Sequence, residues 1–223
     1  MILMPSRCRP ILVLMVMAVF VFLILGCESA YYGTMEKLGY HKRELMVNRV
    51  ESARDAQEEA KEQFESALDK FSSVLQFDGG DLEDKYDQLK TEYDRSEDRA
   101  QTVRDRVDAV EDVAEDLFDE WEAELQQYNS DSLRRSSARK LQQTRRQYNQ
   151  LIGAMKRAEK KMDPVLTAFH DQVLFLKHNL NARAIASLQT ELVSVEAEVN
   201  SLIREMEASI NEANAFINTM AKE

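Results

Sequence analysis

Apolar residues recur along most of the chain at alternating steps of four and three positions, in four separate runs. The runs cover residues 46–74, 82–128, 141–176 and 185–220, and charged or polar residues fill most of the positions between them. A mean spacing of about 3.5 residues keeps one apolar stripe of a helix facing a partner helix under a left-handed supercoil. The pattern therefore predicts four long amphipathic helices whose stripes pack against one another.

Polar and aromatic residues also occupy stripe positions. We interpret the polar ones as residues that fix the register of helix packing, and the aromatic ones as core residues, with a water-lined path as the alternative for the polar positions. The polar residues are Gln57, Ser96 and Thr144, and the aromatic residues are Tyr86, Tyr93, Trp121, Tyr128 and Tyr148.

Three interruptions separate the runs. The sequence FDGGD at 77–81 has two glycines that can stop a helix, followed by Asp81 as a cap for the next one. The sequence YNSDSLRRS at 128–136 offers Ser130, Asp131 or Ser132 as a cap. The sequence KHNLNARAI at 177–185 fits either a turn or a stutter in one long helix. Pro164 keeps the phase of its run, so we expect it inside a helix.

These boundaries predict an all-α fold with helices over residues 45–77, 82–128, 132–178 and 182–221. The runs have similar lengths of roughly 40 to 47 residues, which favours an elongated antiparallel four-helix bundle or coiled coil over residues 45–223. The alternative is an extended hairpin of two helices with an outsized third, completed by self-association. In either arrangement each stripe needs a partner.

The N-terminus predicts an export signal or an anchor helix. Two arginines precede fifteen residues, 11–25, without a polar side chain, whereas a membrane-spanning helix needs roughly 20. The sequence Ile-Leu-Gly-Cys at 24–27 resembles the lipobox of bacterial lipoproteins. That resemblance implies a signal peptide over 1–26, lipid on Cys27 as the new N-terminus, and, with Glu28 rather than Asp next, the outer membrane. The alternative is an uncut anchor helix.

Residues 27–44 form the expected tether between lipid and bundle. Its tyrosines and basic residues fit a membrane-proximal contact, with the rings at the interface and the cations on phosphates. The residues of this contact are Tyr31, Tyr32, Tyr40, Lys42 and Arg43. A flexible tether without such a contact is the alternative interpretation.

Charge and composition argue against several classes of function. The net charge is −11, and it becomes −13 after residues 1–26 are removed, because they carry two arginines and no acid. So acidic a chain is a poor binder of nucleic acid. Removal also takes Cys8 and leaves Cys27 as the one cysteine. His41, His170 and His178 lack the spacing of metal ligands, and no phosphate-binding loop or nucleophile motif is present. We therefore predict no cofactor, no metal and no enzyme activity.

Two stretches resemble a known family. They are MEKLGYHKRELMVNRVESARDAQEEAKEQFESAL from Met35 and DQVLFLKHNLNARAIASLQ from Asp171, and they are similar to an uncharacterised family of proteobacterial lipoproteins, a domain of unknown function that spans nearly the whole mature chain. The resemblance implies no activity or ligand.

The sequence thus predicts a structural or interaction module of the cell envelope, facing the periplasm. It would be held by the lipid on Cys27 and would dock an unidentified protein. The alternative is a membrane-remodelling or transport-accessory coiled coil that self-assembles on the membrane. A cytoplasmic coiled coil associated with nucleic acid is the third and least favoured interpretation.

Overall fold

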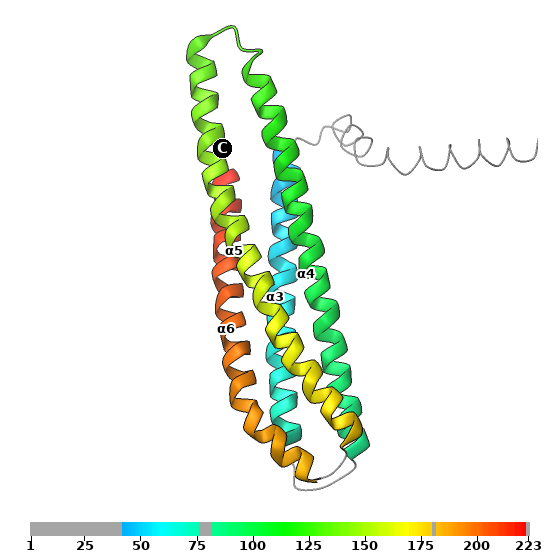
Figure 1. Ribbon diagram of the computed structural model, residues 1–223. Coiled ribbons are helices and arrows are strands. Elements are labelled where there is room, and N and C mark those ends of the chain that lie inside the picture. Colours follow the sequence, from blue (N-terminus) through cyan, green and yellow to red (C-terminus); the bar gives the residue numbers. More distant parts are fainter. Residues whose placement is uncertain (1–41, 76–81, 180–181, 222–223) are drawn as a thin grey trace, which may run out of the picture. The chain divides into compact units, whose positions relative to one another are not determined.

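The computed structural model of the chain describes residues 42–75, 82–179 and 182–221. Residues Leu45–Glu223 form one compact unit. Four helices build it: α3 (Lys42–Leu75), α4 (Leu82–Leu125), α5 (Asp131–His178) and α6 (Ala182–Met220). They run alternately up and down and pack side by side (Figure 1). The predicted all-α helical bundle is confirmed.

Polar contacts between helices fix which helix lies beside which. Arg99 of α4 pairs with Glu59 of α3, and Arg104 of α4 pairs with Asp163 of α5 at 2.7 Å. Arg157 of α5 approaches Glu205 of α6 at 3.4 Å. Since Arg54 of α3 donates to Asn214 of α6 at 3.2 Å, the last helix lies beside the first. The bundle is therefore closed within the chain, and the arrangement completed by self-association is wrong.

The predicted stripes form the core of the bundle. All nine stripe positions of the first run, from Met46 to Val74, are buried. Phe169 of α5 stacks on Phe71 of α3 with ring centroids 4.5 Å apart, and lies 6.4 Å from the ring of Phe64. These contacts cross the bundle between diagonal helices, so the aromatic rings fill the central layer.

The helices differ in length more than the sequence indicated. α3 has 34 residues and α6 has 39, whereas α4 has 44 and α5 has 48. The pairing of Glu59 with Arg99 places the start of α3 beside α4 well short of its C-terminal end. The α4–α5 hairpin therefore extends beyond α3 and α6 (Figure 1). We call residues 119–140 the hairpin tip.

Only two helices pack in the hairpin tip, and its aromatic positions are correspondingly less buried. Trp121 is half-buried and donates from Nε1 to Ser137 Oγ at 2.8 Å. Tyr86, Tyr93 and Tyr148 are also only half-buried. The interpretation of the aromatic stripe residues as core is therefore wrong for these four, which are half-buried, and for Tyr128, which is exposed.

The loop at the hairpin tip begins earlier than the sequence indicated. The amides of Gln126 and Gln127 donate to the carbonyls three residues earlier, at 3.3 and 2.9 Å, and so tighten the last turn of α4. α4 ends at Leu125, and Tyr128 lies in the loop, where it is exposed. Ser130 is the cap of α5, and its Oγ accepts from the amide of Leu133 at 3.4 Å.

The other boundaries differ by a few residues or fall outside the described part. α3 begins at Lys42, so Lys42 and Arg43 belong to its first turn instead of preceding it. Pro164 lies inside α5, as predicted. α5 and α6 are two separate helices that run antiparallel (Figure 1), so a stutter within one long helix is wrong. The predicted break at 77–81, including Asp81, lies outside the described residues.

Candidate functional site

The predicted lipid site and most of the predicted membrane-proximal contact lie outside the described residues. These are the signal peptide, Cys27, Tyr31, Tyr32 and Tyr40. Lys42 and Arg43 are half-buried at the start of α3, and each interacts with another group of the protein. The described residues therefore leave the membrane contact as a prediction.

Residues 42–75, 82–179 and 182–221 contain neither a helix that could span a membrane nor a cluster of metal ligands. No helix there combines the length and the apolar character needed to cross a membrane. No three His, Cys, Asp or Glu side chains gather there as metal ligands would. His170 is exposed, with Nδ1 3.6 Å from the Asp171 carboxylate and its ring 5.5 Å from that of Tyr93.

One buried polar pair joins the first helix to the last. Ser209 Oγ of α6 donates to Gln57 Oε1 of α3 at 2.8 Å, and both residues are fully buried. Gln57 Nε2 has no partner among the described residues. Because a buried polar group must be paired to avoid its desolvation cost, this bond favours one register of α6 on α3.

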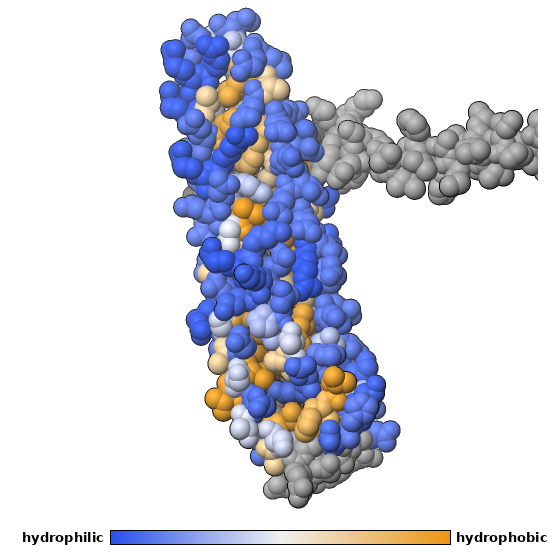
Figure 2. All heavy atoms as spheres, in the orientation of Figure 1, coloured by the Kyte–Doolittle hydropathy of each residue, from blue (hydrophilic) through white to orange (hydrophobic). Residues whose placement is uncertain are grey.

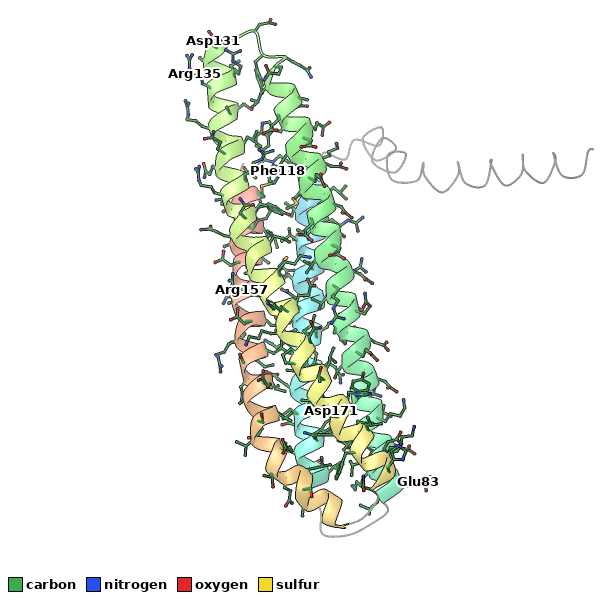
Figure 3. All side chains as sticks on the ribbon, in the orientation of Figure 1. Glu83, Phe118, Asp131, Arg135, Arg157 and Asp171 are labelled. Carbon is green, nitrogen blue, oxygen red and sulfur yellow. The ribbon has the colours of Figure 1, made fainter. Side chains whose placement is uncertain are left out.

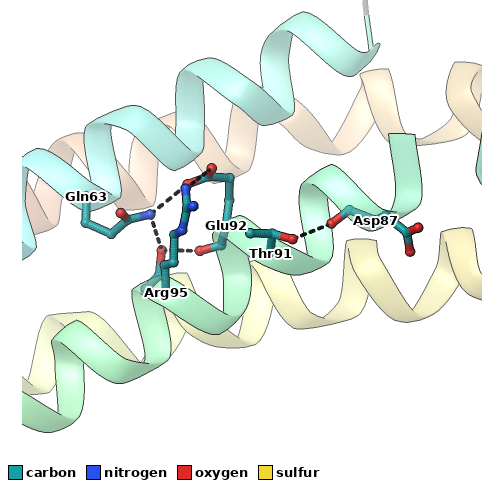
Figure 4. A network of polar contacts seen from close by, with 6 residues as sticks. Gln63, Asp87, Thr91, Glu92 and Arg95 are labelled. Carbon is teal, nitrogen blue, oxygen red and sulfur yellow. Dashed lines mark hydrogen bonds and ion pairs between the residues drawn. The ribbon is translucent and has the colours of Figure 1, made fainter. Parts of the chain in front are cut away.

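The other two polar stripe residues that the sequence singled out behave differently. Thr144 Oγ1 donates to the carbonyl of Lys140 in its own helix at 3.1 Å. Ser96 Oγ donates to the carbonyl of Glu92 at 2.8 Å and accepts from Gln63 Nε2 of α3 at 3.5 Å. Ser96 thus belongs to a polar network between α3 and α4 (Figure 4).

The centre of this network is Glu92. Its carboxylate accepts from Gln63 Nε2 at 2.9 Å and from Arg95 at 3.0 Å, while the neighbouring Thr91 donates to the carbonyl of Asp87 at 2.8 Å (Figure 4). The network stabilises the α3–α4 contact. Gln63 and Arg95 also line a second groove of about 380 Å³, together with Asp98, Arg99 and Thr102.

A groove of about 460 Å³ lies between the C-terminal part of α5 and the start of α6. Gln172 lines it, is only 4% exposed, and has no partner for either Nε2 or Oε1. The remaining lining residues combine apolar side chains with small hydroxyls and two acids: Ala168, Asp171, Phe175, Ser187, Leu188, Glu191, Ser194 and Val195.

Exposed large apolar side chains of the described residues gather at the two ends of the unit. Tyr128 and Leu133 lie at the hairpin tip, Phe175 lines the groove, and Leu174 and Val193 belong to the same two helices as the groove. Figure 2 shows hydrophobic side chains on the surface near the groove end, next to a mainly hydrophilic middle. Exposed apolar groups rimmed by polar ones are typical of interaction sites, so the groove is the better candidate for partner binding.

Gln172→Leu should raise the free energy of unfolding by roughly 1–2 kcal/mol, because it removes two buried polar atoms that lack hydrogen-bond partners. Urea unfolding followed by circular dichroism measures this. Gln172→Glu is the matched control and should lower stability, because it buries a charge. A loss of stability in Gln172→Leu would contradict the expectation and indicate ordered water on the amide.

Electrostatic contacts tie α4 to α5 between the hairpin tip and the Arg104–Asp163 pair. Burial disfavours the charged form of Lys156, but its hydrogen bonds to Glu111 and Asp108 outweigh burial and raise its pKa. Burial and the nearby Glu111 raise the pKa of Tyr148 to about 12. The Tyr148 ring meets Phe118 edge-on, with ring centroids 5.4 Å apart. These groups stabilise a helix contact.

Tyr148 should make stability fall in alkali. In the unfolded chain the phenol loses its proton near pH 10, whereas the folded protein keeps it up to a pKa of about 12. The stabilisation is therefore complete below about pH 10 and is lost as the pH rises through the folded pKa, at up to about 1.4 kcal/mol per unit. Urea midpoints above pH 10 should decline less steeply for Tyr148→Phe than for wild type, and parallel declines would contradict this.

The described residues define an all-α protein built as an antiparallel four-helix bundle, with a polar pair in its core and an apolar groove at one end. A family profile described as "Protein of unknown function (DUF2959)" matches residues 31–220, and the chain belongs to this family. The match starts after Cys27 and leaves the lipid site untested. No curated protein and no solved structure matches the chain.

The sequence did not reveal the groove. Phe175 and Leu174 fall beside the stripe rather than on it, and Gln172 occupies a stripe position but was not among the polar residues that we singled out. The sequence feature that could have indicated the groove is the run Val-Leu-Phe-Leu at 173–176. Four consecutive apolar residues cannot all lie on one stripe of a helix, so some of them must lie outside the core stripe.

Proposed function

We propose that this protein is a lipid-anchored structural and interaction module of the cell envelope that faces the periplasm. The sequence at 24–27 supports the anchor through its resemblance to a lipobox. The bundle fold supports the assignment as a structural and interaction module. Its apolar stripes are satisfied within one chain, so the folded unit is a stiff body that presents surfaces to other molecules.

The observation that carries this proposal is the position of the exposed apolar side chains at the ends of a closed bundle. A bundle that needed a partner for its core would expose a continuous stripe. The groove between α5 and α6 is the docking place that we propose, and it suits a segment with three properties. An apolar side chain would enter beside Phe175 and Leu188, an amide would pair with Gln172, and a cation would lie near Asp171 or Glu191.

No catalytic step is part of the proposal. The side chains whose pKa values shift most, Lys156 and Tyr148, lie in contacts between α4 and α5, where they hold the helices together. The groove is lined by an amide, two serines and two acids, and this set fits recognition of a peptide.

Two experiments on the full chain test the proposal. Metabolic labelling with palmitate should label wild type and leave Cys27→Ala unlabelled and unprocessed. A photo-crosslinking amino acid at Phe175 should give a defined product with another protein, whereas the same group at Glu97, exposed on α4, should not. Labelling of Cys27→Ala at wild-type level, or no product from Phe175 in intact cells, would count against the respective half of the proposal.

A second candidate function is a coiled coil that self-assembles on the membrane. The observation that favours it is the segregation of charge on the hairpin. Residues 105–124 of α4 contain ten acids and one base, whereas residues 132–158 of α5 contain eight bases and no acid. Copies held at one membrane could therefore attract one another through unlike faces.

A further inference from the structure

Two rows of unlike charge run along the outer surface of the α4–α5 hairpin. On α4, Asp98, Asp105, Asp112 and Asp119 follow one another at steps of seven and are all exposed. Seven residues make almost two turns of a helix, so these four share one side of α4. They stand opposite the buried stripe that contains Val103 and Val110, and we call them the acidic ridge.

α5 carries the matching feature. Arg139, Arg146 and Lys160 occupy one heptad position, Arg135 lies one turn before them, and all four are exposed. These four form what we call the basic ridge, along which Figure 3 labels Arg135. The ridge spans 25 residues, or about 38 Å at the rise of an α-helix. No acid lies between its first and last members except Glu159, which is half-buried.

Most charged side chains of the two ridges form no ion pair within the described residues. Other charges of the hairpin are paired, for example Arg145 with Glu122 at 2.5 Å. By contrast, Arg135, Arg139 and Arg146 form no ion pair within the described residues, and neither do Asp112 and Asp119. The fold therefore leaves two rows of opposite charge, both facing solvent.

The two ridges overlap in height over part of their length. Arg104 pairs with Asp163 and Glu122 with Arg145, so the antiparallel register brings Asp105 near the level of Lys160 and Asp119 near the level of Arg146. Two copies standing parallel, side by side, would have Asp105, Asp112 and Asp119 of one at the level of the segment from Arg146 to Lys160 of the other. Parallel copies are what a common membrane anchor would produce.

Gly153 adds an observation independent of charge. It follows Arg146 by seven residues and precedes Lys160 by seven, so it lies in the middle of the basic ridge. A Cβ there would meet only Arg157 Nη1, at 3.7 Å, so packing within the chain does not require glycine. Glycine inside a helix is unfavourable relative to alanine. Its absent side chain would, however, let a neighbouring helix approach closely.

We propose that copies of this protein associate side by side, with the basic ridge on α5 of one copy against the acidic ridge on α4 of the next. An anionic lipid surface would also attract arginines, but the acidic ridge beside them and the net charge of −11 oppose it. The unlike surfaces make a heterologous contact, which can continue from copy to copy. Exposed ion pairs are individually weak, so the association is reversible and salt-sensitive. The inference concerns the bundle and holds whether or not Cys27 carries lipid.

Energy transfer between donor-labelled and acceptor-labelled copies of the full chain, in vesicles of the neutral lipid phosphatidylcholine, tests the proposal. Wild type should associate at low salt and at least about tenfold more weakly at about 0.5 M NaCl. One variant reverses the facing part of the basic ridge by Arg146→Glu and Lys160→Glu. The other reverses the facing part of the acidic ridge by Asp105→Lys, Asp112→Lys and Asp119→Lys. Each alone should lose at least about tenfold in association, and an equimolar mixture of the two should recover it.

Two controls separate this contact from other effects. Reversal of three exposed acids on α3, by Glu62→Lys, Glu65→Lys and Asp69→Lys, changes the net charge as much as the acidic-ridge variant does and should leave association near wild type. Gly153→Trp keeps all charges and should weaken association by filling the ridge, with helicity by circular dichroism confirming the fold. Reversed variants that associate as wild type does, a mixture that does not recover, or binding only to anionic vesicles would overturn the proposal.

Discussion

Phe169→Ala should lower the free energy of unfolding by about 3–5 kcal/mol, the usual cost of removing a fully buried aromatic side chain. Phe169 is completely buried and stacks on Phe71, with an angle of 11° between the ring planes. The substitution leaves a cavity where α3 and α5 meet across the bundle, and long helices cannot collapse into it without moving their neighbours. Chemical unfolding monitored by far-ultraviolet circular dichroism measures the loss.

Val193→Ala is the matched control for this prediction. Val193 is 72% exposed, so its truncation should change stability by no more than about 0.5 kcal/mol. A Phe169→Ala protein whose free energy of unfolding lies within about 1 kcal/mol of the wild-type value would show that α3 and α5 do not pack through this ring.

Ser209→Ala should cost about 1–3 kcal/mol, because it leaves the buried amide of Gln57 without its one hydrogen bond. Adding Gln57→Leu to the same protein should restore stability to wild type or above, since both polar partners are then replaced by apolar groups. The non-additive recovery is the diagnostic result, and a thermodynamic cycle of the two single variants and the double variant measures it.

The double variant should also lose precision of packing. If the Gln57–Ser209 bond fixes the register of α6 on α3, broader amide signals in NMR spectra should accompany its higher stability. If the double variant lost as much free energy of unfolding as the two single variants added together, a direct bond between the two side chains would be contradicted.

The sequence predicted the core of this fold well, because a heptad stripe reports which side of a helix is buried. Met46, Phe64 and Phe71 were assigned to the core by spacing alone, and each is buried. Pro164 was placed within a helix for the same reason, and Ser130 was among the expected caps. These features depend on neighbours along the chain, which a sequence displays directly.

Features that depend on alignment between helices were not predicted. The pairing of Gln57 with Ser209 joins stripes separated by 152 residues, and spacing within one stripe contains no information about its height relative to another. The overhang of the hairpin tip follows from differences in helix length and was missed for that reason. The steps of seven between aspartates can be read from the sequence, but the partial overlap in height of the two charge ridges depends on the ion pairs between α4 and α5.

The contact between α3 and α6 has a consequence for biosynthesis. Ser209 emerges 152 residues after Gln57, and at about 5–20 residues per second that delay lasts roughly 8 to 30 s. Throughout this interval α3 has been synthesised, but α6, which packs beside it in the final fold, has not. The apolar face of α3 must be shielded by α4, by α5 or by a chaperone until the last forty residues or so have been translated.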